Sequence, residues 1–213
     1  MEPALLKRAG YVVRMRVPVL LTFSALATLH APAQAQKREA TNVRLEFRAA
    51  SDSFSAARNE YEQIWAAYGS RMIAVMELAS GLRFVYPQYA DTAIVVTVRE
   101  EAANSGFRDR SGIVMRASYS ADTKRTTLMH ELGHRLMAGL FRREEDEHYQ
   151  LFLWLYDAWI LMFGRDTADE QVAIEKRRGE RYVTAWNRVL ALSADQRAEA
   201  WRRELDERLP TRR

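Results

Sequence analysis

Apolar residues recur at helical spacing over long stretches of this chain and at strand spacing over two short ones. Side chains repeating every three or four positions predict a helix over 53–80, capped by Ser51 or Asp52. The β-branched run 92–98 and the alternating run 113–119 predict two strands. The first half of the chain therefore predicts a long helix followed by a small sheet.

The second half of the chain predicts helices throughout. Apolar periodicity indicates them at 124–140, 151–163, 169–192 and 194–208. The second of these reads LFLWLYDAWILMF and is apolar on every side, so we expect it to be buried all round. It is also too short to span a membrane. One helix, two or three strands and four further helices give an α+β fold class in which helix dominates.

The first 35 residues are typical of an export signal. Basic residues precede an apolar run over 17–31, and Ala33 and Ala35 form an A-x-A cleavage site. The run is shorter than the ~20 residues that span a bilayer, although an uncleaved anchor remains the alternative. We expect a signal peptide over 1–35, a single domain over 36–213, and a periplasmic or secreted protein with no membrane span after cleavage.

Composition removes several kinds of chemistry. The chain of 213 residues has no cysteine, which excludes disulfides, thiolate zinc sites, iron–sulfur clusters and cysteine nucleophiles. Its formal charge of +4 comes from 32 basic and 28 acidic residues. Four of the basic residues and one acidic residue lie in 1–35, leaving 28 against 27 in the rest. The domain is therefore nearly neutral, and its charge gives no support for a nucleic-acid partner.

Residues 130–134 read HELGH, a pattern that indicates a metal site. Positions i and i+4 lie one helical turn apart, so the imidazoles of His130 and His134 can share one metal ion. Zinc suits imidazole nitrogen, and a catalytic zinc has three protein ligands and lowers the pKa of a bound water to ~7. Glu131 is placed to take a proton from that water. We expect one Zn²⁺ ion, with His130 and His134 as ligands and Glu131 as general base.

Gly133 is unusual at the centre of this helix. Glycine costs about 1 kcal/mol in a helix interior relative to alanine. We therefore expect a packing reason for it, such as the close approach of a strand or loop to the site.

The HELGH form, the apolar residues around it and the strand-before-helix order resemble the zincin metallopeptidases. The likeness covers about residues 92–165 in architecture and five residues in motif. It implies a zincin-like domain, zinc-dependent hydrolysis of a peptide or protein substrate, and Glu131 as the later proton shuttle. It also implies that strand 113–119 is the rim strand that pairs with an extended substrate. In residues 135–141, other residues stand at the positions where metzincins have a glycine and a third histidine, which excludes that subgroup.

The third metal ligand has three candidates. We favour His148, at a distance from the motif similar to that in SprT-like zincins; Glu147 would make the site gluzincin-like, and Asp157 is a further possibility. Asp157 is the one charge inside the apolar run 151–163, so it is either a structural hydrogen-bond acceptor or the partner of a ligand histidine. Nine residues at 100° each would place it opposite His148 on a regular helix. Both can face the metal only if His148 precedes that helix.

Other polar residues carry weaker expectations. Tyr119, Tyr149 and Arg116 are candidates for stabilising an oxyanion, and the sequence does not choose among them. The charged runs 142–147 and 175–181 are predicted to be solvated faces.

These observations favour an exported zinc-dependent peptidase. Two other functions use the same residues. One is a non-catalytic periplasmic binding or assembly module with a structural zinc site, which would have four protein ligands and no open position. The other is a zinc amidase that acts on cell-wall material with the same chemistry.

Overall fold

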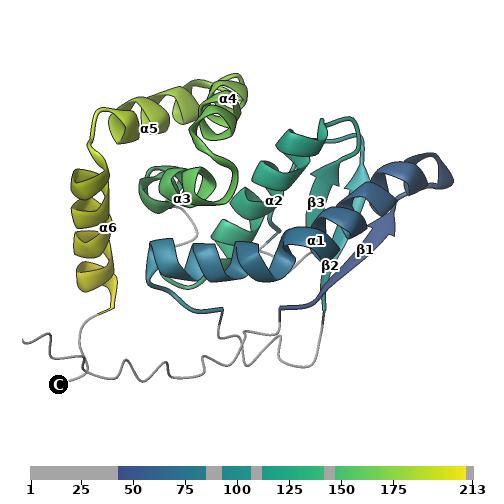
Figure 1. The fold of residues 1–213 in the computed structure, drawn as a ribbon, viewed down its shortest axis with the longest axis horizontal. Helices are drawn as coiled ribbons and strands as arrows, with labels where there is room; N and C mark the ends of the chain where they lie inside the picture. Colours follow the sequence, from purple (N-terminus) through teal and green to yellow (C-terminus); the bar gives the residue numbers. More distant parts are fainter. Residues whose placement is uncertain (1–42, 85–92, 107–111, 142–146, 210–213) are drawn as a thin grey trace, which may run out of the picture. The chain divides into compact units, whose positions relative to one another are not determined.

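A parallel sheet and a set of helices form the described part of this computed structural model (Figure 1). The structure describes residues 43–84, 93–106, 112–141 and 147–209. The predicted signal peptide lies outside the described residues. The predicted α+β class with dominant helix is confirmed.

The sheet has three strands, one more than the sequence pattern located. They are β1 (Leu45–Ala49), β2 (Ile94–Arg99) and β3 (Ile113–Arg116), in the order β1-β2-β3 and all parallel. β1 was not predicted because it is a short edge strand in which only Phe47 is buried. Phe47 pairs in register with Val96 of the central strand.

The long first helix makes the parallel pairing of β1 and β2 possible. Parallel neighbours need a crossover that returns the chain to the same end of the sheet. A 3-10 turn over Asp52–Phe54, with Ser51 as its N-cap, leads into α1 (Ser55–Ser80), which supplies that crossover. The helix ends at Gly81, whose φ of 70° is favourable for glycine.

At Val114, the outer edge of β3 is paired with a neighbouring segment of the same chain. The Asn104 N–H donates to the Val114 carbonyl (3.0 Å) and the Val114 N–H donates to the Asn104 carbonyl (2.8 Å). β3 also ends at Arg116, three residues short of the predicted strand. An extended substrate therefore cannot pair with β3 at Val114, because both backbone groups of that residue are taken, and the expected rim strand stays a prediction for the rest of β3.

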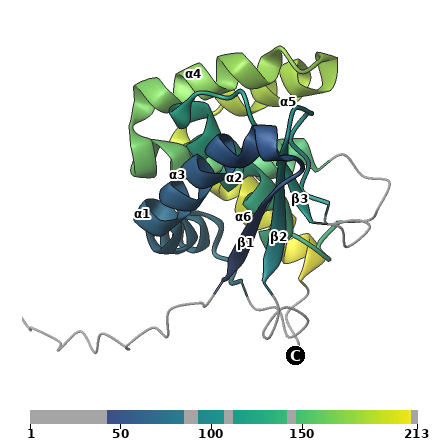
Figure 2. The ribbon, with the colours of Figure 1, turned by 90° about the vertical axis from the view of Figure 1, so that its right-hand side faces the viewer.

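The helices that follow β3 in the chain are α2 (Ala121–Leu136), α3 (His148–Phe163), α4 (Arg165–Lys176), α5 (Glu180–Leu190) and α6 (Ala194–Arg208). The others pack around α3. Helix α3 contacts each of the other five, as predicted from its apolar sequence (Figure 1). α1 contacts β1 and α2 contacts β3, so these two helices join the sheet to the helical part (Figure 2).

One predicted helix is divided in two. The apolar periodicity over 169–192 predicted a continuous helix, whereas α4 and α5 are separated by a turn at Gly179. The φ of Gly179 is 138°, a conformation that side-chain-bearing residues rarely adopt. The chain direction changes there, which brings the residues on either side of the turn toward α2.

All described residues belong to one compact unit over 39–213. Among them, no helix has the length and apolar content that a bilayer crossing requires.

Candidate metal centre

Helix α2 places the two motif histidines side by side. The Ser120 side chain caps the helix by accepting a hydrogen bond from the Thr123 N–H, so α2 begins at Ala121, three residues before the predicted start at 124. His130 and His134 follow one turn apart on a buried stretch of the helix, and their Nε2 atoms are 3.0 Å from each other. The spacing in the sequence is therefore realised as a pair of converging imidazoles.

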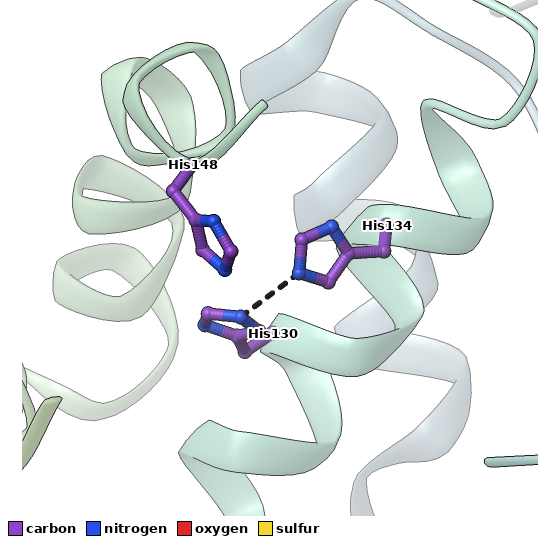
Figure 3. Close-up of side chains that lie close together, drawn as sticks. All are labelled: His130, His134 and His148. Atoms are coloured by element: carbon purple, nitrogen blue, oxygen red, sulfur yellow. Dashed lines mark hydrogen bonds between the residues drawn. The ribbon is translucent and has the colours of Figure 1, made fainter. Parts of the chain in front are cut away.

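His148 completes the group from the first residue of α3. The three imidazoles point toward one another (Figure 3), and one nitrogen from each lies within 4.8 Å of the others. All three residues are buried, with between 1% and 8% of their surface exposed. We call His130, His134 and His148 the trihistidine cluster. It brings together the two motif histidines and the favoured third ligand.

Two buried carboxylates hold the other nitrogen of the motif histidines. The Nδ1 of His130 is 2.7 Å from a Glu175 carboxylate oxygen, and the Nδ1 of His134 is 3.1 Å from Glu147. A carboxylate on Nδ1 keeps the proton there and leaves Nε2 as an electron-pair donor. Glu147, an alternative third ligand in the sequence, contacts the back of His134 and is not in the group of ligand atoms.

Of the two roles expected for Asp157, the structure shows the structural one, that of a hydrogen-bond acceptor. Its carboxylate accepts two hydrogen bonds from Arg197 of α6, at 2.6 and 2.9 Å. His148 opens α3 and Asp157 follows nine residues later, on the opposite side of the helix. The role of histidine partner that the sequence offered to Asp157 is taken by Glu175.

Glu175 was predicted to be solvated, and this was wrong. It is fully buried and also accepts a hydrogen bond from the Trp186 indole N–H at 2.9 Å. Burial raises its pKa, but the charge and hydrogen bond of His130, with smaller contributions from Arg178 and Trp186, lower it to about 2. Its helix carries a recognisable signal. The buried residues of α4 are spaced as one helical face: Ala168, Gln171, Val172 and Glu175.

Glu131 faces the same interior. It is only 2% exposed, and burial raises the pKa of its carboxyl to about 7 despite the opposing charge of His134. It is not one of the carboxylates that hold an imidazole Nδ1. A carboxyl group with this pKa can exchange a proton near neutral pH.

Tyr182 packs against the cluster and Arg178 packs against Tyr182, and no sequence pattern predicted a role for either residue. The Tyr182 ring, on α5, is 4.5 Å from the His148 ring between centroids and is almost fully buried. Arg178, in the turn before α5, lies over this ring at 5.6 Å and contacts the Tyr119 hydroxyl at 3.5 Å. The turn at Gly179 inside the charged run was the available signal that this segment folds inward.

The three oxyanion candidates are separated by the fold. The Tyr119 hydroxyl contacts Arg178, which lies over the ring of Tyr182, a neighbour of His148. Arg116 instead forms an ion pair with Glu100 at 2.7 Å, and the Tyr149 ring lies under the guanidinium of Arg188 at 3.8 Å. Of the three, Tyr119 has the contact that leads toward the site.

The glycine in the motif allows α2 and α3 to approach each other. A Cβ on Gly133 would lie 2.6 Å from the Leu151 Cδ1 and 3.2 Å from the ring of Trp154. The expected packing reason is therefore present, but the neighbour is a helix and not a strand or loop. This close approach brings the start of α3, with His148, to the face of α2 that carries His130.

We expect Gly133→Val to destabilise the protein by about 2 kcal/mol, because extra carbon atoms in a filled core force side chains to shift. Thermal unfolding monitored by circular dichroism measures the effect. Ala66→Val, on an exposed position of α1, controls for the helix propensity of valine and should change stability by less than about 1 kcal/mol. Equal losses in the two variants would show that α3 does not constrain this position.

The donor set of the cluster fits a metal ion. Three buried imidazoles converge through one nitrogen each, and carboxylates hold two of them from behind. The trihistidine cluster could therefore bind a metal ion.

Removing the charge of Glu175 should weaken this site. We expect Glu175→Gln to lower zinc affinity about 10- to 100-fold, because the amide no longer fixes the His130 proton on Nδ1. Competition titration against a chromogenic chelator measures the affinity. The matched control is Asp157→Asn, which loses its ion pair to Arg197 and should keep the affinity of the parent. A Glu175→Gln protein that binds zinc as tightly as the parent would contradict the assigned role.

No family model, curated protein or solved structure matches this chain.

Proposed function

We propose that the chain is an exported zinc-dependent peptidase. The basic and apolar pattern of residues 1–35 supports export. The single observation that supports the activity is that three buried histidines converge and that a buried carboxyl group, Glu131, lies one residue after His130. Metal ligands with a separate acid–base group beside them are typical of a hydrolytic site.

The residues of the chain divide into three tasks. His130, His134 and His148 would hold the zinc, and Glu175 and Glu147 orient two of them. Zinc, when bound, supplies a Lewis acid that polarises the substrate carbonyl and acidifies water.

Glu131 moves the proton. It takes one from the water whose oxygen attacks the peptide carbonyl carbon, and it gives that proton to the amine nitrogen as the carbon–nitrogen bond breaks. Burial raises the pKa of its carboxyl to about 7, so the group can both accept and return a proton at neutral pH. The products are a carboxylic acid and an amine, so one water is consumed for each bond.

The number of ligands favours catalysis over a structural zinc site. In the described part of the chain, the only group of histidine, aspartate and glutamate side chains placed to share an ion is the trihistidine cluster. A structural zinc site has four protein ligands, whereas a catalytic one keeps a position for water. Three imidazoles from the chain are the set expected of an open site.

The proposal is tested on the purified protein with and without zinc. We expect about one zinc per chain, hydrolysis of unfolded protein or mixed peptides, loss of that hydrolysis with a chelator, and its return with added zinc. X-ray absorption should show the ring scattering of three imidazoles and one further oxygen ligand. A fourth protein ligand, with no hydrolysis of any peptide, would support the scaffold alternative instead.

A further inference from the structure

We propose that Arg178, with the hydroxyl groups of Tyr119 and Tyr182, binds a carboxylate of the substrate beside the trihistidine cluster. This rests on the proposed function and names the chemical class that the site selects. The carboxylate is either the free C-terminus of a peptide or an acidic side chain next to the bond that is cleaved.

Arg178 is turned inward, unlike its neighbour. Arg177 is exposed and donates to the carbonyl of Ala173 in its own helix at 3.2 Å. Arg178 is partly buried, lies over the Tyr182 ring and contacts the hydroxyl of Tyr119. Three segments therefore meet at its guanidinium: the turn before α2, the turn before α5, and α5 itself.

This guanidinium lies within electrostatic range of the reacting groups. Burial lowers the pKa of Arg178, but the carboxylates of Glu175 and Glu131 raise it above the usual range. The ring of Tyr182 links it to the cluster, at 4.5 Å from the His148 ring and 6.4 Å from the His130 ring. A substrate group held by Arg178 would thus be close to the bond that Glu131 acts on.

The partners that Arg178 has in the structure leave it suited to an anion. Its 3.5 Å contact with Tyr119 is at the long limit of a hydrogen bond, whereas a guanidinium–carboxylate bond is usually ~2.7–2.9 Å. Glu175, the buried carboxylate whose charge acts most strongly on Arg178, already accepts from His130 and Trp186. The planar fork of an arginine matches the two oxygens of a carboxylate and would bind it better than a phenol.

Recognition by side chains also fits the occupied edge of β3. The pairing of Val114 with Asn104 removes the backbone groups that would otherwise hold an extended peptide there. A charged anchor at Arg178 positions a substrate without that pairing.

The test measures binding, so it does not depend on turnover. Zinc-loaded Glu131→Gln protein is titrated calorimetrically with one peptide in three forms: free C-terminus, C-terminal amide, and amide with an internal aspartate. We expect one of the two carboxylate forms to bind about 10- to 100-fold more tightly than the plain amide. Which one does so identifies the source of the carboxylate.

Adding Arg178→Gln should remove this preference and leave zinc content unchanged. Arg178→Lys keeps the charge but loses the fork, so it should retain part of the preference even if the glutamine variant folds poorly. Arg177→Gln makes the same charge change one residue away and should keep all of it. Equal affinity for the three peptides, or a preference that survives Arg178→Gln because zinc alone holds the carboxylate, would overturn the proposal.

The two proposals can fail separately. A zinc-loaded parent that hydrolyses nothing but prefers carboxylate peptides through Arg178 would overturn the peptidase and keep this binding site. A parent that hydrolyses acid and amide peptides equally, with equal affinity, would overturn the carboxylate site alone.

Discussion

Glu131→Gln is expected to lower kcat for peptide hydrolysis about 10²- to 10⁴-fold and to leave zinc bound, because glutamine keeps the size of the side chain but cannot accept the proton. Glu131 is buried beside His134, so the substitution also removes a titrating group from the interior. The decrease should be in kcat more than in KM, since the proton is moved in the transition state. Steady-state kinetics with elemental analysis of the same sample measure both quantities.

Glu175→Gln provides the contrast for this experiment. It changes a second buried carboxylate in the same way, but one that holds the His130 Nδ1. It should weaken zinc binding, and excess zinc should restore much of its activity. Glu131→Gln should gain nothing from excess zinc. A Glu131→Gln protein as fast as the parent would show that this residue is not the base.

His148→Ala is expected to have the largest effect on the metal itself. It removes one of three imidazoles, so zinc affinity should fall by more than the ~100-fold upper range for loss of a residue behind a ligand. The side chain lies at the start of α3 and packs against Tyr182 and Phe152, so a modest loss of stability should accompany the change. Zinc content after dialysis against a weak chelator measures the metal, and thermal unfolding measures the stability.

Gln150→Ala, two residues further along α3, is the control. Its side chain is partly exposed and points toward Glu204 of α6, away from the cluster. It should keep full zinc content. Retention of one zinc per chain by His148→Ala, at the affinity of the parent, would contradict the assignment of the third ligand. Glu147, which holds His134 in the structure, would then be the first residue to test in its place.

Local pattern was sufficient for the parts of the fold that depend on nearest neighbours. The apolar sequence of α3 predicted a helix buried on all sides, and it contacts five other helices. The i, i+4 spacing predicted that His130 and His134 converge. β1 was missed because an edge strand buries one residue, Phe47, and so shows little periodicity. The break at Gly179 was missed because apolar residues on both sides of it keep helical spacing.

Long-range contacts decided the rest of the site. Glu175 reaches His130 across 45 positions of the sequence, and its charged neighbours made the segment resemble a solvated surface. Asp157 was expected to have a partner because it is the one charge in an apolar run, but that partner, Arg197, lies on another helix. A buried charge indicates that a partner exists, and the sequence does not say which one.

The two edges of the sheet also bear on how this protein avoids aggregation. Exposed strand edges recruit strands from other molecules, and proteins protect them by covering them or by placing charges along them. Here Asn104 covers β3 at Val114, while β1 carries the exposed charges of Glu46 and Arg48, which pair with each other. Substituting those two charges with valine would leave a flat apolar ribbon at the rim of the molecule, the kind of surface from which fibrils grow.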